Sequence, residues 1–398
     1  MFRLFGKKVF RPTVTQDDKD WIEMNIISLI KSYGFERLKE APFIFPTEEN
    51  FPYTNFKDEY QFQKLFEQLC NYWDLDHNWI SVNFFEDVQS KEWETLIPQG
   101  SSNEPAWSYS QFYIKNEKRF KIQLAKSDLD NPGLLISVMA RILASVKSTV
   151  SNHYIMQNSP DIRPYRDLTC IFFGFGILFA NTVWAKKPYW TIHSGALPNQ
   201  VISYTNALIC YVTEQNVGNC ESFLNSNTKD LFKKDYEFLN NTGNTLLTKD
   251  KISESDVIFK LRKQVSDGLH GGGYEKAIEA GRKLISLDPI DSSALNNVGY
   301  AFLHQRKYNE AIVEFTKAIE VRPNSAFPYN NRGYCKLQIG EFADAFSDIQ
   351  HSLDMNQGNS YAWRNMGAYY LKINEFEKAL SCFEKAEKIN PATEMINF

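Results

Sequence analysis

The sequence predicts an α+β N-terminal domain, with short strands and several helices, followed by an all-α solenoid of helical repeats. Residues recur at intervals of 34 in the C-terminal third, whereas the rest of the chain has no such repeat. The non-repeating part instead alternates strand-like and helix-like apolar patterns and is rich in aromatic residues. We therefore expect an aromatic-rich domain over residues 1–250 and a repeat region over residues 251–398.

The composition excludes several classes of function. The 398 residues are 43% hydrophobic and carry a formal net charge of −4. Without clustered Lys and Arg we expect no nucleic-acid partner. The six cysteines form no CxxC pair, which favours reduced thiols in a cytoplasmic protein over a zinc site. The longest apolar run, residues 170–180, is far shorter than the roughly 20 residues that span a bilayer, so we expect a buried helix there and no membrane span.

The N-terminal domain is predicted from local patterns. Trp79 to Phe85 alternates like a strand, and the stretches SQFYIK and FKIQLA flank a polar turn like a hairpin. Apolar residues recur at helical spacing in the other segments. We expect helices over residues 17–32, 58–73, 132–153, 164–184 and 198–214.

Four columns of residues fall in register in the C-terminal third. Small residues in two of the columns allow neighbouring helices to approach closely, and large apolar residues in the others fill the gaps between them. The columns are Ala277, Ala311, Ala345 and Ala379; Tyr274, Tyr308, Phe342 and Phe376; Gly299, Gly333 and Gly367; and Phe315, Ile349 and Phe383.

This pattern resembles the tetratricopeptide repeat (TPR) family, whose units are helix–turn–helix pairs. The stretch SYAWRNMGAYYLKINEFEKALSCFEKAEKINP carries the motif most completely. The resemblance implies about four units, of which the first is atypical because Val265 replaces the glycine and Gly281 replaces the large apolar residue. The stretch HGGG then falls in an inter-helix turn, where Gly272 shares its position with Gly340 and Asn374 and is suited to positive φ. A hydrolase would need a GxSxG nucleophile motif beside such a loop, and the chain has none.

The first helices of such units line a concave groove, and Asn297, Asn331 and Asn365 recur along it. An amide can donate and accept hydrogen bonds, and the resemblance implies that this column binds the backbone of a peptide. Replacing the three residues is expected to weaken partner binding and leave folding intact. The alternative is that the amides only solvate the groove of a scaffold. Further candidate peptide-binding residues are Asn296, Asn330, Arg364, Tyr300, Tyr334 and Lys372, with His304, Gln338, Phe327 and Tyr361 nearby.

A weaker resemblance, over residues 40–215, is to a bacterial zincin-type metallopeptidase domain. The residues that carry it are Pro46, Thr47, Phe51, Pro52, Asp167, Leu168, Gly174, Gly176, Ala180 and Asn181. The positions that would hold the H-E-x-x-H ligands and base are instead Arg141, Ile142 and Ser145, and the third ligand falls near Arg163. Since Arg cannot ligate a cation and Ile cannot act as a base, we expect no metal, no cofactor and no catalytic residue. Asp161, Arg163, Arg166 and Asp167 are expected to form an ion network.

The sequence therefore predicts a non-enzymatic bacterial protein, a pseudoenzyme and adaptor that binds a protein or peptide partner through its repeats. Two rivals stay open: a toxin-neutralising immunity protein, and a hydrolase with an unrecognised N-terminal active site. The chain stops soon after Pro391, so the last repeat is also expected to expose apolar surface for self-association.

Overall fold

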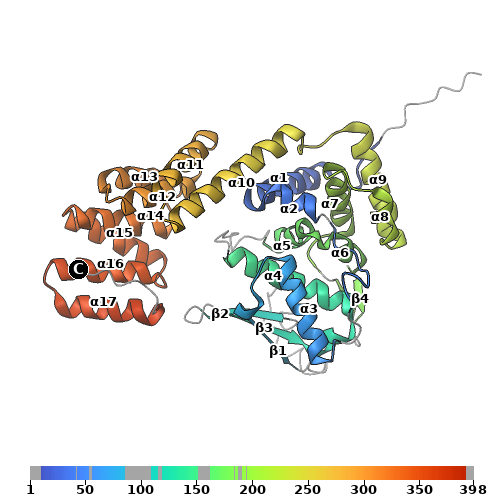
Figure 1. Ribbon diagram of the computed structural model, residues 1–398, viewed down its shortest axis with the longest axis horizontal. Helices are drawn as coiled ribbons and strands as arrows, with labels where there is room; N and C mark the ends of the chain where they lie inside the picture. The colour runs from blue at the N-terminus through green and yellow to red at the C-terminus, as the bar shows by residue number, and fades with distance from the viewer. Residues whose placement is uncertain are drawn as a thin grey trace, which may run out of the picture. The chain divides into compact units, whose positions relative to one another are not determined.

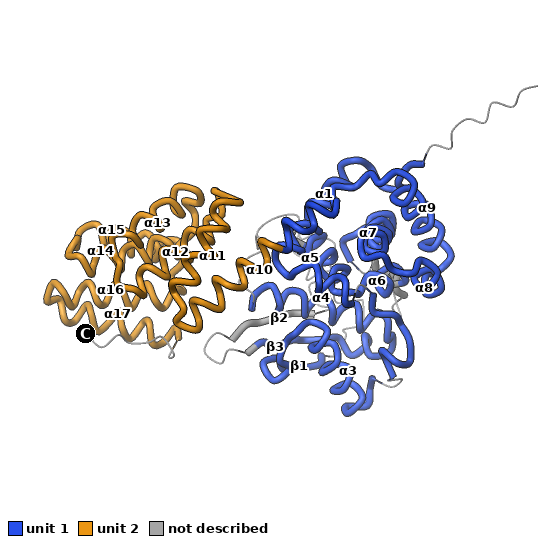
Figure 2. Tube along the Cα trace, turned by 45° about the horizontal axis from the view of Figure 1, so that its top comes forward, with its two compact units in different colours: residues 1–114, 118–256 blue, residues 115–117, 257–398 orange. Residues whose placement is uncertain are grey.

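The computed structural model describes residues 10–41, 43–52, 56–85, 109–114, 119–150, 162–182, 184–186, 191–193 and 195–390 (Figure 1). Within it the chain divides between Asp256 and Val257 into two compact units (Figure 2). Both units are mainly helical. Asp161 of the predicted ion network and the residues that follow Asn390 lie outside the described ranges.

Helices dominate the N-terminal unit. The helices predicted over residues 17–32, 58–73, 132–153 and 198–214 are confirmed within the described residues, which do not include 151–153 of the third. Asp58 accepts a hydrogen bond from the backbone N–H of Gln61 and so caps its helix. The helices are α1 (Gln16–Tyr33), α2 (Phe35–Glu40), α3 (Glu59–Tyr72), α4 (Pro132–Val150), α5 (Ile162–Cys170), α6 (Gly176–Thr182), α7 (Asn199–Val212), α8 (Val217–Ser222) and α9 (Ser226–Thr242).

The strands of this unit are short. In a three-stranded sheet, β3 (Arg119–Ala125) lies between β1 (Ile80–Phe85) and β2 (Tyr109–Ile114). β2 and β3 are antiparallel, which confirms the predicted hairpin, and β1 runs parallel to β3. β4 (Trp184–Lys186) and β5 (Thr191–His193) form a separate antiparallel pair. With strands this short among so many helices, the α+β description fits the unit only in part.

The prediction of one helix over residues 164–184 is wrong. A wide helical turn, η4 (Ile171–Phe175), separates α5 from α6, and inside it Gly174 has φ of 101°. A Cβ atom on Gly174 would lie 3.0 Å from the carbonyl oxygen of Ala41, and the Gly174 carbonyl accepts a hydrogen bond from Ile44 N. Only glycine combines this backbone conformation with so close an approach. The run is nevertheless buried, as expected.

The core of the N-terminal unit is aromatic and apolar. The Trp73 ring stacks on that of Phe173 with centroids 4.3 Å apart.

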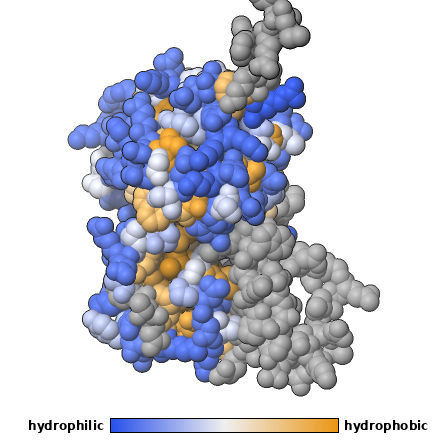
Figure 3. Space-filling model, turned by 90° about the vertical axis from the view of Figure 1, so that its right-hand side faces the viewer, coloured by the Kyte–Doolittle hydropathy of each residue, from blue (hydrophilic) through white to orange (hydrophobic). Residues whose placement is uncertain are grey.

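By length and composition α4 could cross a membrane, but 67% of its most apolar stretch is buried within the protein, as in the central helix of a folded core. On the face drawn in Figure 3, hydrophobic residues gather in a patch near the centre, and hydrophilic residues make up most of the other coloured surface.

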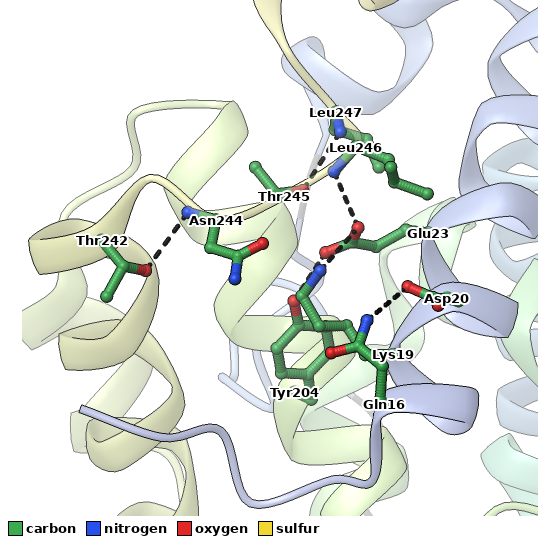
Figure 4. Close-up of polar contacts among 10 residues, drawn as sticks. All are labelled: Gln16, Lys19, Asp20, Glu23, Tyr204, Thr242, Asn244, Thr245, Leu246 and Leu247. Atoms are coloured by element: carbon green, nitrogen blue, oxygen red, sulfur yellow. Dashed lines mark hydrogen bonds and ion pairs between the residues drawn. The ribbon is translucent and has the colours of Figure 1, made fainter. Parts of the chain in front are cut away.

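A buried ionic cluster ties the first helix of this unit to its last segment (Figure 4). Glu23 of α1 is fully buried and forms an ion pair with Lys19 at 3.1 Å. The same carboxylate accepts hydrogen bonds from the Tyr204 hydroxyl on α7 at 2.6 Å and from Leu246 N at 2.7 Å. Because a buried charge needs partners, this set of contacts fixes how α1, α7 and the segment after α9 pack together.

The C-terminal unit is built from consecutive helix pairs. After α10 (Lys249–His270), which begins before the unit boundary, come α11 (Tyr274–Leu287), α12 (Ser292–His304), α13 (Tyr308–Val321), α14 (Ala326–Gln338), α15 (Phe342–Met355), α16 (Ser360–Lys372) and α17 (Phe376–Ile389). Each pair is joined by a short turn that contains one residue of positive φ. These residues are Gly272, Arg306, Gly340 and Asn374, with φ of 73°, 59°, 87° and 62°. The positive φ predicted for Gly272, Gly340 and Asn374 is confirmed.

Glycine permits close contact inside the later pairs. A Cβ on Gly299 would lie 2.8 Å from the Phe315 ring, and one on Gly367 would lie 2.7 Å from the Phe383 ring. The first pair reverses the arrangement, as its sequence predicted. Its first helix carries Val265, its second carries Gly281, and a Cβ on Gly281 would collide with Val298 of the next unit. In the later units a large side chain on the second helix fills the space between the paired helices. In the first unit Val265 and Val298 fill the corresponding space around Gly281.

Candidate functional site

Helices α12, α14 and α16 present equivalent surfaces, because residues three, four and seven apart share one helix face. In the middle of each surface lie two polar residues, which are both asparagines on α12 and α14 and are Arg364 and Asn365 on α16. An aromatic residue lies at one or both ends of each surface. We call the combined surface the amide–aromatic face. It consists of Asn296, Asn297, Tyr300, Phe327, Asn330, Asn331, Tyr334, Tyr361, Arg364 and Asn365.

Three of the four aromatic members of this face are exposed to solvent. Phe327 is 51% exposed, Tyr361 is 46% exposed and Tyr300 is 36% exposed. Tyr334 is half-buried, and burial raises the pKa of its hydroxyl, which therefore stays protonated. Large aromatic side chains are enriched in protein–protein interfaces and are costly to leave in water. Their alignment along successive repeats marks a surface suited to a partner chain.

The predicted asparagine ladder is joined by hydrogen bonds within the protein. Asn365 Nδ2 donates to Asn330 Oδ1 at 2.8 Å, and Asn331 Nδ2 donates to Asn296 Oδ1 at 3.3 Å. Asn330 also donates to Asn331 Oδ1 at 3.3 Å. Asn330 and Asn365 are only 4% and 1% exposed. These bonds link α12, α14 and α16 through Asn296, Asn330, Asn331 and Asn365. Asn296, Asn297 and Asn331 are half-buried.

Arg364 gives the face its central positive charge. Its guanidinium lies 5.2 Å from the Tyr361 ring centroid and 5.9 Å from that of Tyr334. Its Nε and Nη2 both donate to Asn365 Oδ1, at 3.2 and 2.9 Å. The cation is thus held between two aromatic rings and orients the buried amide. Lys372 is exposed at the end of the same helix, about two turns beyond Arg364.

An ion pair on the adjoining surface holds α14 in place. Arg332 Nε and Nη2 donate to the two carboxylate oxygens of Asp348 at 2.8 and 2.7 Å, while its Nη1 donates to Thr316 Oγ1. This bidentate contact joins α14 to α15, and the bond to Thr316 joins it to α13. The aromatic rings of α14 are therefore presented from a helix that is fixed on both sides.

Sequence reasoning missed this internal pairing of the amides. It treated each column of residues separately, at intervals of 34, whereas the observed contacts join residues 35 apart. The adjacent pairs Asn296–Asn297 and Asn330–Asn331 in the sequence could have indicated these hydrogen bonds between repeats. Where two asparagines are adjacent on one helix, one can form a hydrogen bond to the neighbouring repeat while the other faces solvent.

The N-terminal unit contains a separate hollow of about 850 Å³ between α3 and β1. Its apolar wall includes Phe62, Phe66, Ile80 and Val82, and its polar rim includes the exposed ion pair Lys57–Asp130. No predicted site residue lies there. The described residues that line the hollow include no His and no Cys. His is the commonest catalytic base in hydrolases, and Cys is a common nucleophile.

At the positions compared with a zinc site, the structure places a buried ion pair. Arg141 Nε donates to Asp167 Oδ1 at 2.7 Å, and Asp167 Oδ2 accepts from Ala196 N at 2.7 Å. The guanidinium lies 4.1 Å from the Phe179 ring centroid. Ser145 donates to the Arg141 carbonyl, so its hydroxyl serves the helix backbone. In the part of the chain that the structure describes, no three His, Cys, Asp or Glu side chains are grouped as a metal would need.

Comparison with known proteins assigns the repeats. Two family models, both described as tetratricopeptide repeat, match residues 360–392 and 292–325. No curated protein matches the chain. Similar solved structures include a crystal structure of MamA, with 25% identity and a TM-score of 0.29 over 32% of this chain and 75% of that one. YrrB, titled a TPR protein with an unusual peptide-binding site, has 16% identity and a TM-score of 0.30 over 48% and 87% of the two chains. The TPR2B domain of yeast Sti1, in a structure titled as a complex with pHsp70, has 18% identity and a TM-score of 0.24 over 32% and 94%.

The matched ranges coincide with helix pairs α12–α13 and α16–α17, and the helices between and before them repeat the same geometry. The C-terminal region of the chain is therefore a solenoid of tetratricopeptide repeats.

Proposed function

We propose that this protein is a non-catalytic adaptor that holds an extended segment of a partner protein along the amide–aromatic face. The exposure of Phe327, Tyr361 and Tyr300 on successive first helices is the observation that carries the proposal. A repeat solenoid offers an elongated surface of this kind to a peptide, and tetratricopeptide repeats are typically interaction modules. The internally bonded amides keep that surface rigid, which lowers the ordering cost of binding.

The chemistry of the face favours a segment with apolar or aromatic side chains. Phe327 and Tyr361 offer ring surfaces on neighbouring repeats, while the half-buried Asn297 and Asn331 offer polar groups to a peptide backbone. Arg364 adds a single central positive charge. A partner that buries apolar side chains against the rings and pairs its backbone with the amides satisfies both kinds of group.

Paired substitutions test the proposal. The full-length protein, tagged and expressed in its native host, is purified with its bound proteins as wild type, as Phe327→Ala with Tyr361→Ala, and as Val313→Ala. Val313 is 52% exposed on the second helix α13 and serves as the matched control. We expect the double substitution to lower recovery of a stoichiometric partner at least tenfold and the control to leave it unchanged. Equal recovery from all three proteins would remove the face from the function.

For the N-terminal unit we propose a structural role, as a metal-free relative of the metallopeptidase fold in a cytoplasmic protein. The buried Arg141–Asp167 ion pair supports this proposal, because a cationic side chain fills the place of a zinc ligand. Both matched repeat models lie outside this unit, so the resemblance to metallopeptidases stays a prediction. Zinc analysis and a general peptidase assay on the purified chain test it, and stoichiometric zinc or turnover would favour the hydrolase alternative.

We also propose self-association through α17. Phe376 and Leu380 of this helix are 61% and 60% exposed. Phe346, which occupies the place of Leu380 one repeat earlier, packs against Tyr369 with ring centroids 5.1 Å apart. Sedimentation velocity of the wild type and of Leu380→Lys tests the proposal. A wild-type monomer at high micromolar concentration would contradict it.

A further inference from the structure

The hollow between α3 and β1 is lined along these two elements mainly by aromatic and aliphatic side chains. The Phe62 ring of α3 packs edge-on against Phe84 of β1 with centroids 4.9 Å apart, and it lies parallel to the Phe66 ring (Figure 1). Val82 and Phe84 are only half-buried, and so is Leu129, which follows β3. An apolar group that covers such a concave surface is bound favourably, because it displaces water from the exposed rings and alkyl groups.

The charged side chains of the hollow lie on two short segments. One is the start of α3 with the residues just before it, and the other is the 3-10 helix η3 (Lys126–Asp130). The two segments meet in an ion pair, in which Lys57 Nζ lies 2.6 Å from Asp130 Oδ1. Among the described lining residues the charges balance, with two cations and two carboxylates: Lys57, Lys126, Glu59 and Asp130. The hollow therefore combines an apolar wall with a rim of no net charge.

The size of the hollow is that of a small-molecule site. Its volume of about 850 Å³ falls in the range of roughly 300–1,000 Å³ that is usual for ligand pockets. Such pockets are mostly apolar and have a few polar groups that orient the ligand. The site belongs to the N-terminal unit alone and does not depend on the amide–aromatic face of the repeats.

We propose that this hollow binds a small zwitterionic amphiphile, with its hydrocarbon chain against the rings of α3 and β1 and its head group at the charged rim. The cationic part of such a head group is attracted by Glu59 and Asp130, and the anionic part is attracted by Lys57 and Lys126. A head group with a single charge would be attracted by one pair and repelled by the other. Both side chains of the Lys57–Asp130 pair are 62% exposed, and so exposed a pair is weak enough for either group to turn toward a ligand.

Isothermal titration calorimetry of the full-length protein tests the proposal. The probe is dodecylphosphocholine, a zwitterionic amphiphile, used below the concentration at which it forms micelles. We expect one molecule to bind per chain with a dissociation constant on the order of 10–100 µM. The absence of measurable binding, or the binding of many molecules per chain without saturation, would overturn the proposal.

Two further probes test the choice of head group. Dodecanoate and dodecyltrimethylammonium have an alkyl chain of the same length, but the head group of each carries one charge. At low ionic strength each is expected to bind about threefold or more weakly than dodecylphosphocholine, because one pair of rim charges repels it. Lys126→Gln leaves the rim with a net negative charge and should raise the affinity for dodecyltrimethylammonium relative to dodecanoate. Tighter binding of either singly charged probe to the wild type would overturn the assignment of a zwitterion.

Matched substitutions on one strand test the location of the site. Val82→Trp places a large side chain in the hollow and is expected to weaken binding of dodecylphosphocholine about tenfold or more. The adjacent residue Asn83 is exposed and does not line the hollow, so Asn83→Trp should leave the affinity unchanged. Circular dichroism and melting curves establish that each variant is folded, and Leu129→Trp replaces Val82→Trp if that variant is not. Unchanged binding by a folded variant with a filled hollow would place the amphiphile elsewhere and overturn the proposal.

Discussion

Asn365 donates a hydrogen bond from Nδ2 to Oδ1 of Asn330 over 2.8 Å and so joins α16 to α14 across a repeat boundary. Both residues were predicted to contact a ligand, yet both are buried. Asn297 and Asn331, on α12 and α14, are half-buried. One row of asparagines therefore supports the solenoid and also supplies polar groups to its surface.

Asn365→Ala is expected to destabilise the protein by about 1–3 kcal/mol, because it removes the hydrogen bond to the buried Asn330 amide and the acceptor of two Arg364 hydrogen bonds. Asn297→Ala, at a half-buried position of the same row, should change stability by less than about 0.5 kcal/mol. Urea unfolding of the repeat region, followed by circular dichroism, measures both. This revises the expectation that substitution of the whole Asn297, Asn331 and Asn365 column leaves folding intact. Equal effects of the two substitutions would contradict the structural role of Asn365.

Gly299→Ala should destabilise the α12–α13 pair by about 1–3 kcal/mol, since the added methyl would lie 2.8 Å from the Phe315 ring. Gly272→Asn should be close to neutral, because no atom lies within 4 Å of an added Cβ and Asn374 adopts the same positive φ three units later. Thermal melting compares the two. A larger loss for Gly272→Asn would show that the backbone conformation of the turn, rather than the space around it, limits substitution there.

Asp167→Ala is expected to cost about 3–5 kcal/mol, because it leaves the Arg141 guanidinium buried without its counter-charge. The matched surface pair, Lys57–Asp130, has both side chains 62% exposed, and Asp130→Ala should cost at most about 1 kcal/mol. Guanidinium unfolding of the full chain provides the comparison. If Asp167→Ala were as mild as Asp130→Ala, the ion pair would not be holding α4 against α5.

Stability should also depend on the protonation of Asp235, whose pKa burial raises to about 6. This buried carboxylate accepts hydrogen bonds from Thr13 N at 2.7 Å and from the Ser203 hydroxyl at 3.2 Å. The unfolded value is about 3.9, so the folded state holds the proton more tightly. The stabilising contribution is thus fully present below about pH 4 and is lost as the pH rises through 6.

Asp235→Asn keeps a neutral side chain at every pH and should remove this dependence. Between pH 4 and pH 7.5 the variant is expected to gain stability relative to the wild type, by roughly 2–3 kcal/mol. Urea unfolding across this range measures the difference. A constant difference between the two proteins would show that the native carboxylate is ionised throughout.

The repeats were predictable because their constraints are local and periodic. A 34-residue interval fixes which residues meet, and the positive φ at Gly272, Gly340 and Asn374 follows from the turn between paired helices. The break at Gly174 was not predictable in the same way. Its run of apolar residues has no periodicity, and the break is required by contacts with Ala41 and Ile44, which are distant in sequence.

Other features depend on contacts between residues far apart in the chain. The hairpin of β2 and β3 is local and was predicted, but the parallel pairing of β1 with β3 requires a crossover that alternation alone does not specify. The Glu23–Tyr204 hydrogen bond joins residues on the first and seventh helices.

Position-resolved photo-cross-linking shows whether a partner protein lies along the amide–aromatic face. A photoreactive phenylalanine analogue is placed at Phe327, at Tyr361 or at the control position Val313, and the full-length protein is irradiated in its native host. We expect Phe327 and Tyr361 to capture the same polypeptide and Val313 to capture little of it. Equal capture at all three positions, or capture from Val313 alone, would contradict the claim that the amide–aromatic face holds the partner.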